Sequence, residues 1–402
     1  MLLWLQTESA LGWVVALTDN TVADRLPRID RGYVVWQSSD SYRWQIYLND
    51  GRSNRQLTDN NMLNIGPQVD RGQVVWLSHY MFAPLEINFF DGEKTRQLTD
   101  NDVCDSFPDF ADGLIVWQQF DGHDDEILFY DGSGIRFLTD NEFPDRHPRT
   151  TAGLIVWEGH DGADGEIYLY RGGRIIRLTE NAFADQNPRI CGGRIVWEGL
   201  DGADWEIFYY DGSRVRQLTD NDLDDCDPEI SESGVAWRAG DGASAGIFLY
   251  DGSEIQRIYF SEMEVGPPEI CGRCVVWEGF DGHDWEIFYY DGSSVVQLTD
   301  NDGDDRYPDI SACGIVWEGD DGSDSEIFLY RPLAPGDLDG DGWVDEQDLA
   351  IIAADFGRVG GFPENPAAAD FFCDGDVDGL DLAFFAARFK SEDGAAGEIA
   401  RR

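Results

Sequence analysis

The chain has 402 residues, of which 42% are hydrophobic, and it includes 14 Trp, 15 Tyr and 23 Phe. This is enough apolar side chain for a packed core, which excludes a chain that is disordered throughout. Only 29 basic residues stand against 79 acidic ones, and the net charge of −50 disfavours binding to nucleic acid or to an anionic membrane surface.

The N-terminal stretch MLLWLQTESALGWVV lacks a basic start and a clean cleavage site, so it makes a poor signal peptide. No run of about 18 apolar residues occurs, so we expect no membrane insertion. Either the protein stays inside the cell, or its secretion signal is not visible in this chain.

A repeat of 40 or 41 residues dominates the sequence. It is marked by a regularly spaced tryptophan, at Trp36, Trp76, Trp117, Trp157, Trp197, Trp237, Trp277 and Trp317. One copy, residues 268–301, reads PEICGRCVVWEGFDGHDWEIFYYDGSSVVQLTDN. Its short apolar segments, separated by Gly and Asp-Gly turns, predict four strands, beginning with PEI and ending with VVQLT. Four strands in about 40 residues is the size of a β-propeller blade.

The strand count predicts a closed ring of eight blades. First strands begin near eight prolines, Pro27, Pro67, Pro108, Pro148, Pro188, Pro228, Pro268 and Pro308. The last repeat lacks a fourth strand, whereas residues 13–20, WVVALTDN, form an additional fourth strand at the start. Pairing the two completes the eighth blade and leaves no open edge. The alternative is an open superhelical stack of repeats.

The repeat unit resembles that of TolB-like propellers over about residues 13–331. The resemblance rests on a DGxxEIY hairpin, a DG turn, an LT strand end and a downstream proline, here Asp281, Gly282, Glu286, Ile287, Asp291, Gly292, Leu298, Thr299 and Pro308. The usual PxWSPDG motif is replaced by forms such as PDISACG. The resemblance implies the fold but no particular function.

Five hairpins carry a DGxDxE motif, namely Asp121/Asp124/Glu126, Asp161/Asp164/Glu166, Asp201/Asp204/Glu206, Asp281/Asp284/Glu286 and Asp321/Asp324/Glu326. Such carboxylates can act in acid–base catalysis or hold a hard cation. We favour turn formation and solvation of the rim, because the motif recurs in blade after blade. We interpret His123, His160 and His283 as turn substitutions, and no nucleophile, zinc-protease or phosphate-loop motif occurs, so no catalytic residue is predicted.

The departures in blades two and six are the most informative. Blade two has SHYMFAPLEI in place of the acidic hairpin, with His79, Tyr80, Met81 and Phe82. Blade six loses both the acids and the LTDN close. These loops could bind a partner or a sugar, or they are drift within a repeat. Cys271 and Cys274 are either a disulfide or a pair of buried thiols.

The composition changes after Pro332, and residues 337–348, DLDGDGWVDEQD, have the spacing of an EF-hand calcium loop. Asp337, Asp339 and Asp341 would bind Ca²⁺ directly, Trp343 through its carbonyl, Asp345 directly or through water, and Asp348 would close the shell. A second loop, residues 370–381, offers Asp370, Asp374, Asp376 (by its carbonyl), Asp378 and Asp381. Phe372 replaces a ligand there, so we expect the second site to be weaker.

The first loop ends in Asp rather than Glu and lacks an entering helix, because RPLAPG cannot form one. Each loop is followed by an apolar segment, LAIIAADFG or LAFFAARF, so residues 336–390 resemble a type I dockerin domain. The resemblance implies two Ca²⁺ sites, a cohesin module as partner and an extracellular or cell-surface location, commonly in polysaccharide breakdown. We therefore expect a propeller (1–331), a linker (332–336), a dockerin (337–390) and a tail (391–402). The leading hypothesis is a secreted, monomeric, non-enzymatic protein whose propeller binds a protein or glycan; the alternative is a glycoside hydrolase or polysaccharide lyase.

Overall fold

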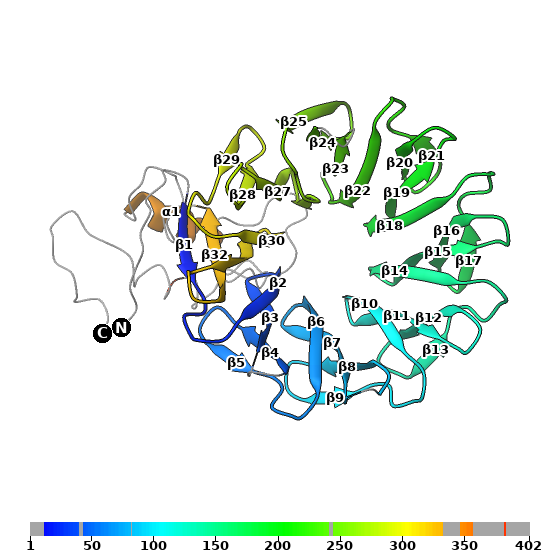
Figure 1. Ribbon diagram of the computed structural model, residues 1–402, viewed down its shortest axis with the longest axis horizontal. Helices are drawn as coiled ribbons and strands as arrows, with labels where there is room; N and C mark the ends of the chain where they lie inside the picture. Colours follow the sequence, from blue (N-terminus) through cyan, green and yellow to red (C-terminus); the bar gives the residue numbers. More distant parts are fainter. Residues whose placement is uncertain are drawn as a thin grey trace.

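The computed structural model describes residues 12–39, 43–81, 83–240, 244–332 and 346–356, together with Leu382. Its strands form eight antiparallel sheets of four strands each, arranged as blades around a central axis (Figure 1). The mainly β, eight-bladed propeller predicted from the repeat is confirmed.

Blades one to seven are each one sheet whose strands follow one another in sequence. Blades one to four contain β2 (Asp24–Asp30), β3 (Tyr33–Ser39), β4 (Trp44–Asn49), β5 (Asn54–Gln56); β6 (Leu63–Asp70), β7 (Gln73–His79), β8 (Glu86–Phe90), β9 (Thr95–Gln97); β10 (Asp105–Ala111), β11 (Leu114–Phe120), β12 (Asp125–Tyr130), β13 (Ile135–Phe137); and β14 (Asp145–Thr151), β15 (Leu154–His160), β16 (Gly165–Arg171), β17 (Arg174–Arg177). Blades five to seven contain β18 (Asp185–Cys191), β19 (Arg194–Leu200), β20 (Trp205–Tyr210), β21 (Val215–Gln217); β22 (Asp224–Ile230), β23 (Val235–Gly240), β24 (Ala245–Tyr250), β25 (Ile255–Ser261); and β26 (Glu269–Cys271), β27 (Cys274–Phe280), β28 (Trp285–Tyr290), β29 (Val295–Gln297).

The eighth blade joins the two ends of the propeller. It consists of β30 (Asp305–Ser311), β31 (Gly314–Asp320), β32 (Ser325–Pro332) and, as its fourth strand, β1 (Gly12–Ala16). β1 runs antiparallel to β32, with Gly12 opposite Pro332 and Ala16 opposite Phe328. The predicted closure by the N-terminal strand is therefore confirmed. Further along the chain, residues Glu346–Asp355 form the helix α1.

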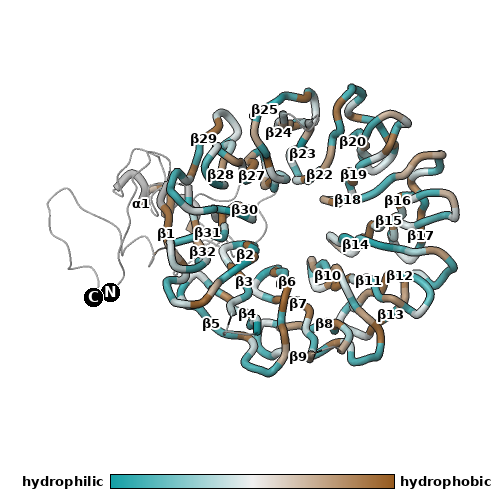
Figure 2. The backbone as a smooth tube through the Cα atoms, in the orientation of Figure 1, coloured by the Kyte–Doolittle hydropathy of each residue, from teal (hydrophilic) through white to brown (hydrophobic). Residues whose placement is uncertain are grey.

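The core consists of the second strands and the tryptophans that mark the repeat. All eight tryptophans are buried, and each packs against the preceding blade, as Trp117 does against Val75, Ile87 and Phe89 of blade two. Figure 2 shows the apolar residues concentrated in the strands and the polar ones in the loops. Each of these tryptophans therefore packs between two blades. The blades must stack, because a single blade cannot bury its own apolar surface.

The first strand of most blades starts three residues before the proline where the sequence places it. In blade three it begins at Asp105, and the register against β11 shifts between Ser106 and Asp109. The extra residue of this β-bulge is Phe107, at a φ of 50°. An aromatic residue in the left-handed region is uncommon and has no sequence signature comparable to glycine, so the bulge was missed.

The two ends of the propeller differ in the connections they carry. Second and third strands join at one end, here called the hairpin face, as between Phe120 and Asp125. The turns between first and second strands and between third and fourth strands lie at the other end, the turn face. Because β32 runs from the hairpin at Asp320 and Ser325 toward Gly12, Pro332 lies at the turn face.

Candidate functional site

The first aspartate of each DGxDxE hairpin forms the turn, as predicted. Asp121 Oδ1 accepts hydrogen bonds from the backbone N–H groups of His123 (2.7 Å) and Asp124 (3.2 Å). These bonds lower the pKa of Asp121, since hydrogen bonds to a carboxylate stabilise its charged form. His123 and His283 are exposed and contribute their backbone N–H to the turn, which agrees with their interpretation as turn substitutions.

The glutamate of the motif does not solvate the rim, and our interpretation of it was wrong. Glu126, Glu166, Glu206 and Glu286 are all 0% exposed. Each points inward from the third strand, toward the loop that leads to the next blade. Burial raises the pKa of Glu126 to about 7, because a desolvated carboxylate favours its neutral form. The sequence did not reveal this burial, since the covering loop belongs to the link between two blades.

Each buried glutamate begins a hydrogen-bonded chain into the next blade. In blade three Glu126 Oε1 accepts the backbone N–H of Asn141 (2.6 Å), and the Asn141 amide donates to Asp145 Oδ2 (2.6 Å). Asp145 Oδ1 in turn accepts the indole N–H of Trp157 (2.7 Å). The same chain links blades four to five, five to six, seven to eight and eight to one.

Blade six lacks the glutamate that would begin this chain. Gly246 lies at the glutamate position and Ser261 replaces the asparagine, while Val265 replaces the aspartate that would accept from Trp277. The indole nitrogen of Trp277 is consequently buried without a hydrogen-bond partner. The loss of LTDN noted in the sequence is therefore the loss of an inter-blade connection.

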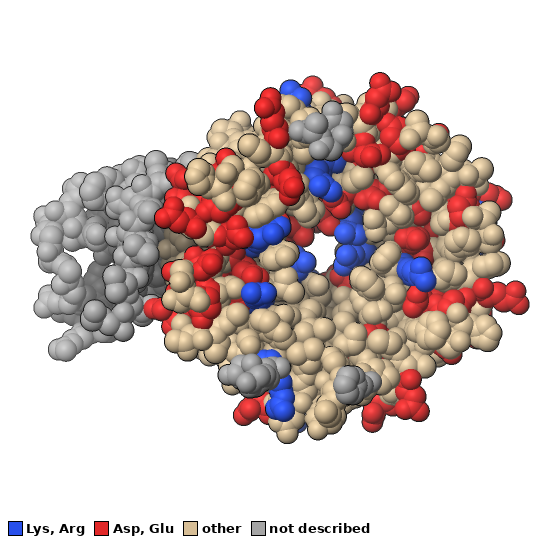
Figure 3. Space-filling model, viewed as in Figure 1, with Lys and Arg blue, Asp and Glu red and all other residues tan. Residues whose placement is uncertain are grey.

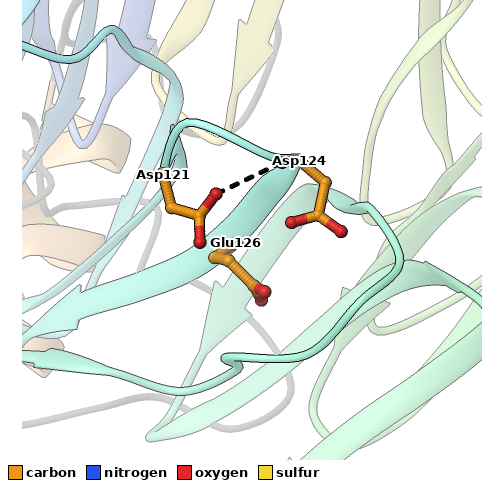
Figure 4. A group of neighbouring side chains, drawn as sticks. All are labelled: Asp121, Asp124 and Glu126. Atoms are coloured by element: carbon orange, nitrogen blue, oxygen red, sulfur yellow. Dashed lines mark hydrogen bonds between the residues drawn. The ribbon is translucent and has the colours of Figure 1, made fainter.

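The hairpin carboxylates form compact groups on the hairpin face. In blade three, oxygens of Asp121, Asp124 and Glu126 lie within 4.8 Å of one another, and their side chains converge on a common space (Figure 4). Equivalent groups are Asp161/Asp164/Glu166, Asp201/Glu206/Asp220, Asp281/Glu286/Asp300 and Asp321/Asp324/Glu326. Unlike a rim of separate solvated acids, each group concentrates negative charge around a buried oxygen.

A second cluster, which the sequence reasoning missed, lies along the axis. The residue after each first-strand proline forms what we call the axial ring: Arg28, Gln68, Asp109, Arg149, Arg189, Glu229, Glu269 and Asp309. Arg28 hydrogen-bonds to Glu269 (3.3 Å), which is two blades away, so these side chains meet over the axis. Burial and the neighbouring Glu229 raise the pKa of Glu269 to about 8. Figure 3 shows basic side chains around the central opening.

The residue before each proline forms what we call the entrance ring: Leu26, Gly66, Phe107, His147, Asn187, Asp227, Pro267 and Tyr307. All eight are different, and all but Pro267 have a φ between 50° and 60°. Side chains of the preceding blade hold several backbone N–H groups, as Gln118 does for His147 and Glu278 for Tyr307. The rings of Phe107 and His147 touch, 5.1 Å apart. Unlike groups therefore converge at the hairpin-face end of the inner strands.

The broken-symmetry loops are only partly described. Tyr80 and Met81 of blade two are exposed, whereas Phe82 and residues 241–243 of blade six lie outside the described residues. Cys271 and Cys274 lie opposite each other at the turn between β26 and β27, and both are free thiols. The disulfide alternative is therefore not observed.

Most of the proposed calcium ligands near the C-terminus lie outside the described residues. Only the backbone of Asp348 is described, within α1. The other ten lie outside the described residues: Asp337, Asp339, Asp341, Trp343, Asp345, Asp370, Asp374, Asp376, Asp378 and Asp381. Their role in binding remains a prediction from the loop spacing.

Comparison with known proteins identifies this region. Residues 335–389 match the family described as the dockerin type I domain. No curated protein matches the chain. Among the described residues, no helix combines the length and hydropathy that a bilayer crossing requires.

Solved structures resemble the propeller at low sequence identity. The computationally designed Ika8 protein is 16% identical with a TM-score of 0.55, and the match covers 78% of this chain and 98% of that one. The propeller domain of the Trilobed protease from Pyrococcus furiosus, which has an open velcro topology, is 15% identical with a TM-score of 0.52, covering 70% and 99%. TolB from Acinetobacter baumannii is 16% identical with a TM-score of 0.40, covering 70% and 85%.

At these identities the structural likeness shows the fold alone. The family match adds the biochemical character of the C-terminal region, because dockerin domains bind calcium and pair with cohesin modules. The chain therefore consists of an eight-bladed β-propeller followed by a type I dockerin domain.

Proposed function

We propose that this protein is a secreted, non-enzymatic binding and display protein, anchored through its dockerin to a cohesin-bearing scaffold or cell surface. The observation that carries the proposal is the dockerin match at residues 335–389. An extracellular, polysaccharide-degrading setting follows from the usual context of dockerins. In this proposal residues 332–336 are a linker, residues 337–390 the dockerin and residues 391–402 a tail.

Two calcium loops would organise the dockerin, with the ligands set out in the sequence. Carboxylate and carbonyl oxygens at EF-hand spacing suit Ca²⁺, which takes six to eight oxygen ligands. The second loop has Phe372 in a ligand position, so we propose a weaker second site. Calcium binding would fold the module and so make the cohesin-binding surface available.

The anchoring role is tested with the full chain on a panel of immobilised cohesins. We expect binding in calcium chloride, loss of binding in EGTA, and loss on Asp341→Ala in the first loop. Asp393→Ala, in the acidic tail beyond the loops, is the matched control and should bind like the parent. Binding that survives both EGTA and Asp341→Ala contradicts a calcium-dependent dockerin, and failure on every cohesin of a broad panel contradicts the anchoring role.

The propeller would bind its ligand at the entrance ring. Phe107 and Tyr307, in the first strands β10 and β30, are 56% and 48% exposed. Both residues have a positive φ. A residue other than glycine in this left-handed region costs of the order of 1–3 kcal/mol, and the conformation persists where the surrounding structure holds it. Aromatic rings beside polar groups are suited to stacking on sugars or to packing on a protein loop. Since Pro332 lies at the turn face, a tether there would leave the entrance ring free.

A polysaccharide panel tests this surface. We expect retention of the full chain on a polysaccharide column, weakened at least tenfold by Phe107→Ala. Phe137→Ala, which removes an equally exposed ring (55%) from outer strand β13, is the control. Equal weakening by both variants, or none by either, contradicts binding at the entrance ring.

The second candidate function is a glycoside hydrolase or polysaccharide lyase. It is favoured by the axial ring, where acidic and basic groups meet at one place and burial raises the pKa of Glu269 to about 8. A carboxyl group with a raised pKa can serve as a general acid. Product analysis on the same panel decides: cleavage that Glu269→Gln abolishes would establish this function, and undegraded polysaccharide supports the binding role.

A further inference from the structure

Blade four contains a cation of its own inside the hairpin group. Arg177, at the end of β17, donates from Nη2 to Asp161 Oδ2 (2.8 Å) and to Glu166 Oε1 (2.7 Å). Its guanidinium also donates from Nε to the backbone carbonyl of Thr179. The paired Glu166 side chain is 0% exposed. This hairpin group therefore accepts a positive charge at a fixed place.

The other blades with the group have no such cation. The position of Arg177 is taken by Phe137 in blade three, Gln217 in blade five and Gln297 in blade seven. Each of these blades nonetheless keeps the hairpin aspartate and the buried glutamate within a group of three carboxylates. Buried carboxylates without a positive partner are costly, so these three blades lack a charge that blade four supplies.

Buried oxygens in these blades also lack hydrogen-bond partners. Glu126, Glu206 and Glu286 each use Oε1 to accept a backbone N–H, while Oε2 is buried and unpartnered. Oδ1 of Asp124 in blade three and Oδ1 of Asp284 in blade seven are also buried without a hydrogen-bond partner. Figure 4 shows the Glu126 side chain beside those of Asp121 and Asp124. Native proteins leave few such atoms unpaired, so each indicates an absent partner. Glu166 Oε2 and Asp164 Oδ1 of blade four are unpartnered as well, so blade four differs from these blades in its guanidinium and not in these oxygens.

We propose that blades three, five and seven each bind one divalent cation, Ca²⁺, between the hairpin aspartate, the buried glutamate and a third carboxylate. That third group is Asp124 in blade three, Asp220 in blade five and Asp300 in blade seven. Blade eight is not included, because the amide of Asn20 approaches Glu326 Oε2 at 3.5 Å.

The donor set selects the ion. All donors are carboxylate oxygens, which are hard ligands and suit Ca²⁺ or Mg²⁺ rather than zinc or copper. Two oxygens bound to one Ca²⁺ lie at most about 5 Å apart, and the group meets this limit at 4.8 Å. With three carboxylates from two loops and open access to water on the exposed side, the group lacks the near-octahedral cage that Mg²⁺ requires.

The test measures calcium stoichiometry on the full chain by equilibrium dialysis. The variant carries Asp121→Asn, Asp201→Asn and Asp281→Asn, and we expect it to bind three fewer ions than the parent. The control carries Asp131→Asn, Asp211→Asn and Asp291→Asn, which change the turn-face aspartates of the same blades, and it should bind as many as the parent. Ions held by the dockerin are common to all three proteins and cancel.

A second variant fills the groups instead of weakening them. Phe137→Arg, Gln217→Arg and Gln297→Arg copy blade four, so a folded propeller with three fewer ions is expected. Unchanged stoichiometry in this variant overturns the proposal, as does an unchanged count in the asparagine variant. Calcium displaced by an equal concentration of magnesium would overturn the choice of ion. If both variants bind as many ions as the parent while EGTA still abolishes cohesin binding, the propeller sites are refuted and the dockerin role stands.

Discussion

Arg177 donates to Glu166 Oε1 at 2.7 Å, and no other described blade pairs its hairpin glutamate with an arginine in this way. The pair neutralises the group inside blade four. In blades three, five and seven, which lack such a cation, burial raises the pKa of Glu126, Glu206 and Glu286 to about 7.

Replacing this arginine should create a calcium site. We expect Arg177→Gln, which copies blades five and seven, to raise calcium stoichiometry by one ion, because Asp161, Asp164 and Glu166 lose their internal cation. Equilibrium dialysis of the full chain measures the change. Arg171→Gln serves as the control. It removes an exposed arginine at the end of β16 opposite to Glu166, and it should leave the number of bound ions unaltered. A count that stays the same in both variants would contradict the role given to the guanidinium.

The metal-free protein should lose stability as the pH rises. The pKa of Glu126, Glu206 and Glu286 is about 7 in the folded state, above the ordinary value of 4.5. The folded state therefore binds more protons than the unfolded state, and the free energy of unfolding falls between about pH 4.5 and about pH 7. The pKa values of Asp105, Asp185 and Asp305, raised by burial to about 6, act in the same direction.

The measurement is Tm of the calcium-stripped chain at intervals from about pH 5 to about pH 8. We expect a steady decrease, which added calcium should largely reverse at the upper end, since the ion binds the ionised groups. A Tm that climbs over this interval would show that these glutamates are ionised without cost.

The chain of hydrogen bonds between blades should be sensitive to its aspartate. Asp145→Val copies the natural situation at Val265 and leaves the Trp157 indole and the Asn141 amide without their acceptor. Each buried donor left unpaired costs about 1–3 kcal/mol. Thermal or urea unfolding should therefore show a clear loss of stability.

Asp145→Asn is the matched control for this variant. Asn64 accepts from Trp76 at 3.1 Å in blade two, so an asparagine can take this role. We expect the asparagine variant to lie within about 1 kcal/mol of the parent. If the valine variant were as stable as the asparagine variant, the bond to the indole would contribute nothing.

Closure of the ring should depend on β1. Val15 lies opposite Leu329, and Val15→Pro removes a backbone donor from this pairing, at a local cost of about 3 kcal/mol. Loss of β1 also exposes β32 as an open edge, which favours self-association. We expect a lower Tm and larger species by size-exclusion chromatography with light scattering.

The control for closure is Val296→Pro in β29, which occupies the equivalent position opposite Tyr289. β29 belongs to blade seven, and the chain continues from it directly into blade eight. The ring therefore stays closed when the pairing of β29 weakens. A similar loss of Tm without self-association is expected. Identical association behaviour in the two variants would mean that closure does not rely on β1.

The propeller was predictable because its signals are local and repeated. The tryptophan spacing, the Asp-Gly turns and the strand at residues 13–20 lie in the sequence itself, and ring closure follows from counting strands. Burial of Glu126 was not predictable, because the residues that cover it belong to the connection toward blade four. The left-handed residues of the entrance ring were missed because residues such as Phe107 give no backbone signal.

The axial ring did carry a signal. Directly after an invariant proline, the sequence reads Arg, Gln, Asp, Arg, Arg, Glu, Glu and Asp around the eight repeats. A position that changes its charge inside an otherwise constant strand is not explained by turn formation or by packing. The alternation of charge at this position of the repeat distinguishes Arg28 and Glu269 from the surrounding residues.

The pairing of β1 with β32 has a mechanical consequence. Tension applied at Pro332 runs along β32, which has β31 on one side and β1 on the other. The hydrogen bonds of both ladders are then strained together in shear, whereas a strand at the margin of a sheet could be peeled away one bond at a time. A protein held against flow by its C-terminal end would be gripped at a place where the fold resists being pulled apart.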